Sequence, residues 1–304
     1  MNLPKIAILM ASYNGMSWLP AQINSILNQT GAVVCIYVSD DFSQDGSYEY
    51  LRGLSENNPR VKILTNKVKF GSAGRNFYRL IKDVDITGFD YIAFSDQDDI
   101  WESDKLIRHV MIAQEQQADG VSSSVMAFWP DGDLKLIVKS QPQRTWDFLF
   151  ESSGPGCTFL MTPWLVGKVR EQLEDNYSRA SEVDLHDWLT YAICRANGHK
   201  WVIDYRPSVQ YRQHQSNVIG ANSGLKAKLS RLEKLRKGWY RSEIVKVCQV
   251  CAFISNDAQV KKIYSLLMNR TITTQLKLLL YVTQARRKFS DRLILYFLIC
   301  IFLF

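Results

Sequence analysis

Four acidic side chains lie within seven positions, directly after an apolar segment. In the stretch AFSDQDDIWESDKL, residues 93–106, the acids are Asp96, Asp98, Asp99 and Glu102. Carboxylates crowded at one site repel each other and tend to become protonated unless a cation lies among them. Oxygen ligands select hard ions such as Mg²⁺ or Mn²⁺, and Mg²⁺ completes its shell with water and substrate phosphates. Asp96 and Asp98 therefore predict a metal site that bridges a phosphate-containing substrate.

Alternating strands and helices are expected to position these acids. Apolar runs without polar alternation indicate strands buried on both faces, at residues 6–12, 33–40, 61–66 and 89–96. Apolar side chains at helical spacing predict helices at residues 20–28, 48–54, 77–84 and 104–114. This order predicts an α/β, Rossmann-like fold with a mostly parallel sheet and right-handed crossovers.

Polar residues follow each predicted strand. Ligands of such sheets bind beyond the carboxyl ends of the strands, so we expect these residues to form one rim. They are Ser12, Tyr13, Asn14 and Gly15, then Asp40 and Asp41, then Asn66 and Gly71, and finally Ser95 to Asp99. Taken singly, Asp40 and Asp41 could be loop carboxylates before a helix, and Asp99 or Ser103 could cap the helix at 104–114.

Two motifs in the second half are candidates for the rest of a site. GPGCTFLMT, residues 154–162, predicts a strand of the acceptor pocket in which Gly154 and Gly156 permit close backbone approach, or alternatively a bend before an inner strand. In LHDW, residues 185–188, Asp187 lies near the start of a predicted helix whose apolar stripe begins at Leu185. It could be a catalytic carboxylate or an ordinary first-turn residue favoured by the helix dipole.

The positive charge belongs to the C-terminal part. Residues 225–304 contain 16 Lys and Arg against 4 Asp and Glu, whereas residues 1–224 contain 21 against 26. Within 225–239 an apolar stripe alternates with Lys and Arg, which predicts a helix lying in a membrane interface or packed on the preceding domain. The apolar run at 293–304 is shorter than the ~20 residues of a spanning helix, which favours insertion into one leaflet, protein burial or oligomer contact. No recognition motif supports nucleic-acid binding.

The cysteines and the N-terminus bear on the compartment. Six scattered cysteines favour a reducing environment. The single C-x-x-C motif, Cys248 and Cys251, is interpreted as two residues on one face of a helix. Residues 1–5 lead directly into a strand pattern, without the apolar region of a secretory signal. We expect a catalytic domain at residues 1–222 and a basic, helical, membrane-associating region at 223–304.

Four separated motifs carry a family resemblance. ILMASYNG, QINSILNQT, YVSDDFSQDGS and FSDQDD, in that order and spacing, resemble glycosyltransferase family 2, the inverting nucleotide-sugar transferases of GT-A fold. The resemblance covers about residues 4–215. GPGCTFLMT, LHDW and YRQHQSN are similar to the bacterial branch that includes rhamnosyltransferases of O-antigen and capsule assembly.

The resemblance implies roles for individual residues. The nucleotide sugar would contact Ser12, Tyr13, Asn14, Asp40, Asp41, Asn66, Gly71, Asp96, Gln97 and Arg212. Asp41 would bind the base and Asp96 the ribose, while Asp98, with His214 as a further contact, would hold the Mg²⁺ or Mn²⁺ that bridges the diphosphate. Asp187 would be the general base for the acceptor hydroxyl. The chain lacks the Q-x-x-R-W motif of processive synthases, which predicts one sugar per encounter.

The resemblance also suggests partners and a location. We expect transfer of rhamnose from a dTDP donor, or a hexose or N-acetylhexosamine from a UDP donor, to a lipid-linked glycan at the cytoplasmic face of a bacterial membrane. Homo-oligomerisation is left open. A nucleotidyltransferase should have a basic, glycine-rich loop after the first strand, and ASYNGMSWLP has no basic residue. A non-catalytic sugar-binding protein would not need the acid cluster, which is present.

Overall fold

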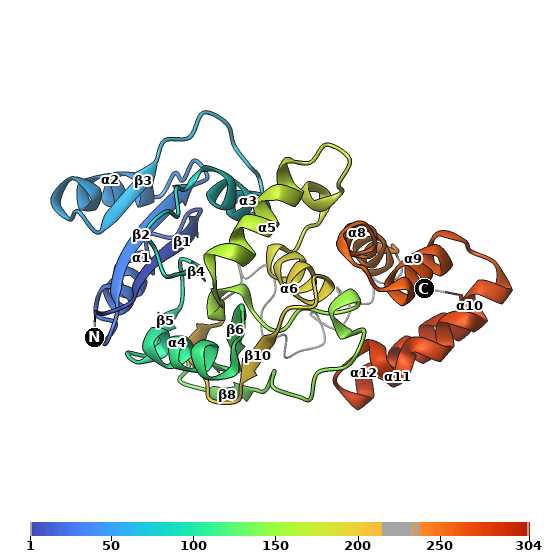
Figure 1. The fold of residues 1–304 in the computed structure, drawn as a ribbon. Coiled ribbons are helices and arrows are strands. Elements are labelled where there is room, and N and C mark those ends of the chain that lie inside the picture. Colours follow the sequence, from blue (N-terminus) through green and yellow to red (C-terminus); the bar gives the residue numbers. More distant parts are fainter. Residues whose placement is uncertain (1, 215–232, 234–236, 303) are drawn as a thin grey trace.

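A mixed seven-stranded sheet forms the centre of the protein (Figure 1). The computed structural model describes residues 2–214, 233, 237–302 and 304. The strand order is β10-β6-β9-β4-β1-β2-β3. The strands are β1 (Lys5–Ser12), β2 (Val33–Asp40), β3 (Val61–Leu64), β4 (Tyr91–Ser95), β6 (Gly120–Ser123), β9 (Leu160–Met161) and β10 (Trp201–Asp204). β1 pairs in parallel with β2 and β4, and only β9 runs antiparallel to its neighbours, so the predicted parallel sheet is confirmed.

Helices cover both faces of the sheet. They are α1 (Leu19–Leu27), α2 (Ser47–Asn57), α3 (Ala73–Asp83), α4 (Lys105–Gln116), α5 (Pro163–Glu174) and α6 (His186–Ala196). Along β1, Ile6 and Ile8 pack in one core with α1, α2 and α4, whereas Ala7 and Leu9 pack in the other with α3, α5 and α6. Successive side chains of a strand point to opposite faces, and because both faces are covered the strand is apolar throughout.

A second sheet brings distant segments to the end of β4. Its order is β5 (Ile100–Trp101), β11 (Val209–Arg212), β7 (Val125–Phe128) and β8 (Leu134–Ile137). β11 pairs antiparallel with β5 and parallel with β7. The acids at residues 96–99 therefore lie next to residues 212–214, although more than a hundred positions separate them.

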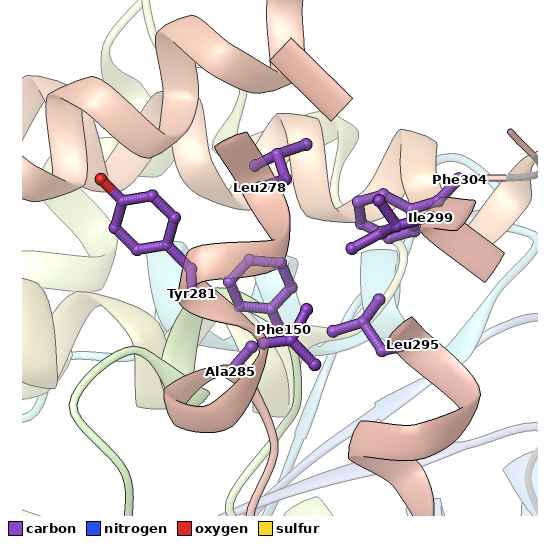
Figure 2. Close-up of a pocket in the computed structure, with 8 residues that line it drawn as sticks. Phe150, Leu278, Tyr281, Ala285, Leu295, Ile299 and Phe304 are labelled. Carbon is purple, nitrogen blue, oxygen red and sulfur yellow. The ribbon is translucent and has the colours of Figure 1, made fainter. Parts of the chain in front are cut away.

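The C-terminal helices share a core with the sheet domain. They are α8 (Trp239–Ile254), α9 (Ala258–Met268), α10 (Ile272–Leu278), the 3₁₀ turn η4 (Leu279–Tyr281), α11 (Val282–Ala285) and α12 (Phe289–Cys300). α8 contacts α6 and the 3₁₀ turn η1 (Asp147–Leu149), and one apolar cluster runs from Ala7 to Phe304. Figure 2 shows Phe150 among Leu278, Leu295 and Phe304.

Several sequence expectations need adjustment. The segment 154–162 is not one strand but matches the alternative interpretation, a bend before an inner strand, because Gly156–Thr158 is a 3₁₀ turn (η2) and only Leu160–Met161 pairs as β9. The third strand ends at Leu64, two residues earlier than expected. Most of the predicted helix at 225–239 and the domain boundary at 222 lie outside the described residues, while Gly238 precedes a new helix, α8, that begins at Trp239.

Most of the cysteines and part of the apolar C-terminal run are buried in the described structure. Cys248 and Cys251 are both buried on α8, as one helix face requires, and all six cysteines are free. The apolar run at 293–304 is partly buried through Leu295, Leu298 and Ile299. Among the helices that the structure describes, none has the length and apolar composition to cross a membrane.

Candidate active site

The loops after β1, β2 and β4 are joined by side-chain to backbone hydrogen bonds. Tyr13 N–H donates to Gln97 Oε1 at 2.7 Å, and Gln97 Nε2 donates back to the carbonyl oxygen of Tyr13 at 2.9 Å. Asn14 has a positive φ of 49°; its N–H donates to Ser43 Oγ at 2.8 Å, and its Oδ1 accepts from Gln44 N at 2.8 Å. These loops form one continuous rim, as the sequence predicted.

Asp40 and Asp41 are buried, and both have protein partners. Asp40 accepts from the backbone N–H and the hydroxyl of Ser43 at 2.9 and 2.5 Å. Asp41 accepts from the N–H groups of Phe70 and Gly71 at 2.5 and 2.8 Å. Asp41 therefore holds the loop after β3 against the end of β2. Each carboxylate oxygen has two acceptor sites, so these bonds leave room for a ligand donor.

Arg79 is a site residue that the sequence did not indicate. Its guanidinium on α3 donates to Ser39 Oγ at 2.9 Å and also to Asn66 Oδ1. Asn66 Nδ2 in turn donates to the carbonyl oxygen of Asp40. Ser12 lies directly opposite Asp40 in the β1–β2 register. Asn66 thus belongs to the same rim as Ser12 and Asp40. Arg79, which no sequence motif indicates, holds Asn66 in place there.

The acids after β4 occupy a site of low polarity. Burial, together with the charges of Asp98 and Asp187, raises the pKa of Asp96 to about 7. Asp99 is fully buried, and one of its oxygens accepts from Arg212 N at 3.1 Å. Its other oxygen has no hydrogen-bond partner within the described part of the chain. Burial raises the pKa of Asp99 as well. Crowded carboxyls in this setting favour a bound cation or a proton.

Asp98 and His214 form a candidate metal site. Asp98 Oδ2 lies 2.7 Å from His214 Nε2, and both side chains are largely buried. The His214 ring stacks on Trp18 with centroids 4.1 Å apart, and Arg212 Nε donates to the carbonyl oxygen of Asp98 at 2.8 Å. A carboxylate oxygen and an imidazole nitrogen that meet at one point fit a divalent cation. Trp18, which orients the imidazole, was missed, because a lone tryptophan in a loop gives no spacing signal.

Asp99 has a different role from the one considered first. The residue before α4 is Asp104, and no side chain caps that helix, so neither Asp99 nor Ser103 is a helix cap. Asp99 instead connects the end of β4 to β11 through Arg212 N–H. It also lies close to Asp96 and Cys157, and ligand atoms of these three lie within 4.8 Å of one another.

Asp187 lies in the first turn of α6, as its motif predicted. One of its oxygens accepts from Trp188 N at 2.6 Å, and burial raises its pKa to about 6. Its negative charge contributes to the raised pKa of Asp96, so the two carboxyls belong to one site. A carboxyl with a pKa near neutrality is suited to accept a proton.

Gly156 brings the turn η2 against α6. A Cβ at this position would lie 2.6 Å from His186 Nε2 and 3.3 Å from the Cβ of Asp187, so only glycine fits without displacement. The His186 ring stacks on Phe77 at 3.9 Å, and burial lowers its pKa to about 3. His186 is therefore a neutral packing residue, and Asp187 is the titratable group of this pair.

The chain is similar to known glycosyltransferases in sequence and in fold. A family model described as glycosyl transferase family 2 matches residues 7–159. The dTDP-rhamnosyl transferase RfbG of Shigella flexneri is 40% identical over 251 residues, which cover 81% of this chain and 87% of RfbG. The UDP-Glc:alpha-D-GlcNAc-diphosphoundecaprenol beta-1,3-glucosyltransferase WfgD of Escherichia coli is 37% identical over 160 residues, or 50% of this chain and 57% of WfgD.

Solved structures resemble the fold over nearly the whole chain. S. aureus TarS 1–349 in complex with UDP-GlcNAc aligns with a TM-score of 0.62 at 12% identity, covering 90% of this chain and 76% of TarS 1–349. The mannosyltransferase PcManGT of Pyrobaculum calidifontis, in complex with GDP-Man and Mn²⁺, aligns with a TM-score of 0.54 at 14% identity. That alignment covers 87% of this chain and 69% of PcManGT.

Proposed function

Because the chain belongs to glycosyltransferase family 2 and is a glycosyltransferase of GT-A fold, we propose that it transfers one rhamnose from dTDP-rhamnose to a lipid-linked oligosaccharide. The reaction would invert the anomeric centre and require Mg²⁺ or Mn²⁺. The similarity to RfbG over most of both chains supports the donor. The geometric observation that carries the proposal is the meeting of Asp98 and His214 with Asp96 and Asp187 at one strand-end site.

The donor side of the site would bind the nucleotide diphosphate. Asp41 would contact the base and Asp96 the ribose, in a rim fixed by Tyr13 and Gln97. Asp98 and His214 would hold the divalent ion, which when bound stabilises the charge that develops on the leaving diphosphate. Arg212, fixed by Asp99 and by the backbone of Asp98, adds a positive charge at the same edge.

The acceptor side would be governed by Asp187. As a carboxylate it accepts the proton of the attacking hydroxyl, which increases the nucleophilicity of that oxygen. A base on one side of the sugar and a leaving group on the other is the arrangement of a one-step displacement. Gly156 allows the turn η2 to line the space beside the base.

The location of the reaction follows from the proposed acceptor. A lipid-linked glycan lies at a membrane surface, so the protein would act as a peripheral enzyme at the cytoplasmic face of a bacterial membrane. In this proposal, residues 1–222 perform catalysis and residues 223–304 associate with the membrane. The excess of Lys and Arg in residues 225–304 supports attraction to anionic lipid.

A UDP-sugar donor is the second candidate. The specific observation in its favour is the match over half of this chain to WfgD, whose name gives UDP-Glc as the donor. The base contact at Asp41 does not separate thymine from uracil, since both rings present the same hydrogen-bonding edge.

Nucleotide binding tests the proposal without knowledge of the acceptor. Isothermal titration of the full chain with dTDP, UDP and GDP, each with and without Mn²⁺, should give metal-dependent binding that is tightest for dTDP. Asp98→Ala should abolish the metal dependence, while Glu115→Ala, an exposed substitution on α4, should not change it. Tighter binding of UDP would favour the second candidate. No metal-dependent binding of any nucleotide would contradict both.

A further inference from the structure

Helices α10 and α12 each expose an apolar stripe on the side away from the core. The stripes recur every four residues, which places their members on one side of each helix. We call them together the outer apolar face: Ile272, Leu276 and Leu280 from α10 and η4, and Phe289, Leu293, Phe297 and Ile301 from α12 and the turn after it. Leu280 is 78% exposed and Leu276 58%, so their burial in the fold is small.

The opposite sides of the same helices account for the packing within the protein. Leu278 of α10 and Leu295 and Ile299 of α12 converge on Phe150, as Figure 2 shows. The inner sides of the two helices thus pack in the core, and the outer apolar face takes no part in that packing. α10 and α12 contact each other, so their stripes lie at the same end of the molecule, opposite β3 in Figure 1.

The charge around this face has one sign. Residues 258–304 contain eight Lys and Arg and a single acid, Asp291. Asp291 is already paired with Arg286, at 3.0 Å. Lys277 and Lys288 are exposed immediately beside members of the two stripes. Arg286 and Arg287 are ion-paired with Glu151 and Asp147, so the exposed cations beside the stripes are Lys277 and Lys288. Apolar side chains next to such exposed cations match the surface of a bilayer that contains anionic lipid. A second copy of this chain would instead bring like charges together.

We propose that the outer apolar face docks on an anionic membrane surface, with its apolar side chains in the headgroup boundary and Lys277 and Lys288 on the lipid phosphates. Within residues 223–304, this identifies one side of α10 and α12 as the surface that contacts the membrane. The inference rests on the proposed function for its purpose, since docking would bring the active site to a lipid-linked acceptor.

Substitution is a better test than deletion, because removing these helices would uncover Phe150 and the core around it. The test variant is Leu276→Ser/Leu293→Ser/Phe297→Ser, which changes only exposed side chains. The matched control is Leu3→Ser/Met111→Ser/Leu134→Ser, three comparably exposed residues of the sheet domain. A charge variant, Lys277→Glu/Lys288→Glu, tests the electrostatic part separately.

Flotation of the full-length protein with vesicles, without donor or acceptor, measures docking alone. We expect the unaltered protein and the control to float with vesicles containing phosphatidylglycerol, and more weakly with pure phosphatidylcholine. The test variant should lose at least about tenfold in vesicle affinity. The charge variant should lose affinity for phosphatidylglycerol vesicles only.

Three outcomes would overturn the inference: no flotation of the unaltered protein, equal flotation of the test variant, or a dimer in light scattering that the test variant converts to monomer. Metal-dependent dTDP binding by the unaltered protein and the test variant reports separately on the proposed function. Lost nucleotide binding with intact flotation would count against that function and leave docking unaffected.

Discussion

Arg287 connects the C-terminal helices to the segment that leads to the candidate base. Its guanidinium is buried, with Nη1 3.2 Å from Asp147 Oδ2 and Nη2 donating to the carbonyl oxygen of Ser152 at 2.5 Å. Its backbone N–H donates to Glu151 Oε1 at 2.5 Å. Four residues after Ser152, Gly156 lies against Asp187. We therefore expect Arg287→Met to affect both stability and catalysis.

The cost can be worked out from the partners that remain. Removing one member of a buried ion pair costs about 3–5 kcal/mol, because the other charge is left uncompensated. Asp147 is fully buried but keeps Tyr191 OH at 3.0 Å and Arg195 Nη1 at 3.4 Å. These partners place the loss at the lower end, about 3 kcal/mol. At roughly 2–4 °C per kcal/mol, the unfolding midpoint should fall by about 6–12 °C.

Thermal unfolding followed by circular dichroism provides the assay, with Arg270→Met as the control because Arg270 is exposed. Exposed substitutions of this kind usually change stability by less than ~0.5 kcal/mol, so the control should stay within about 2 °C of the unaltered protein. Below its midpoint, Arg287→Met should also show a reduced kcat with little change in dTDP affinity. A midpoint within 2 °C of the unaltered protein would refute the reasoning.

Four further predictions concern the site itself. Asp187→Asn should lower the transfer rate by about 10²–10⁴-fold without changing dTDP affinity. The rate of the unaltered enzyme should rise with pH through about 6, because the base loses its proton there. A pH–rate profile of both proteins checks this. Because folding raises the Asp187 pKa from its usual value of about 4, the unaltered protein should lose stability as pH rises from about 4 to above 6. Urea titrations should show that Asp187→Asn reduces this loss, while the part that comes from the raised pKa values of Asp96 and Asp99 remains. Asp98→Ala and His214→Ala should each weaken Mn²⁺-dependent dTDP binding at least about tenfold while leaving metal-free binding unchanged in calorimetry, and equal loss under both conditions would argue against a metal role. Gly156→Ala should cost about 1–3 kcal/mol in urea unfolding because its Cβ collides with a buried ring, whereas Gly167→Ala, with open space around it in α5, should not destabilise the protein.

The parallel sheet could be predicted because its strands are covered on both sides. Ile6 and Ile8 need one apolar layer and Ala7 and Leu9 need the other, so the strand shows no polar alternation. The rim followed from the rule that ligands bind at the carboxyl ends of parallel strands. Tyr13 and Gln97, 84 residues apart, do bond to each other there.

The supporting contacts could not be predicted, because they depend on pairings that no local pattern encodes. β5 has only two residues, too few for a periodic signal, yet its pairing with β11 brings His214 to Asp98. The bond from Arg212 N–H to Asp99 depends on the same pairing. The glycines of segment 154–162 left open a strand or a bend before an inner strand, and the choice depended on packing, because the backbone turns at η2 where Gly156 meets α6.

The apolar cluster that joins Phe150 to Phe304 affects how the protein is made. Translation proceeds at roughly 5–20 residues per second, so Phe150 leaves the ribosome on the order of ten seconds before its last covering residues are synthesised. During that interval the nascent sheet domain presents an apolar surface that its own chain cannot yet cover. Chaperone binding to ribosome-bound intermediates should therefore be strongest for chains stalled before residue 272 and weaken once α10 and α12 have emerged.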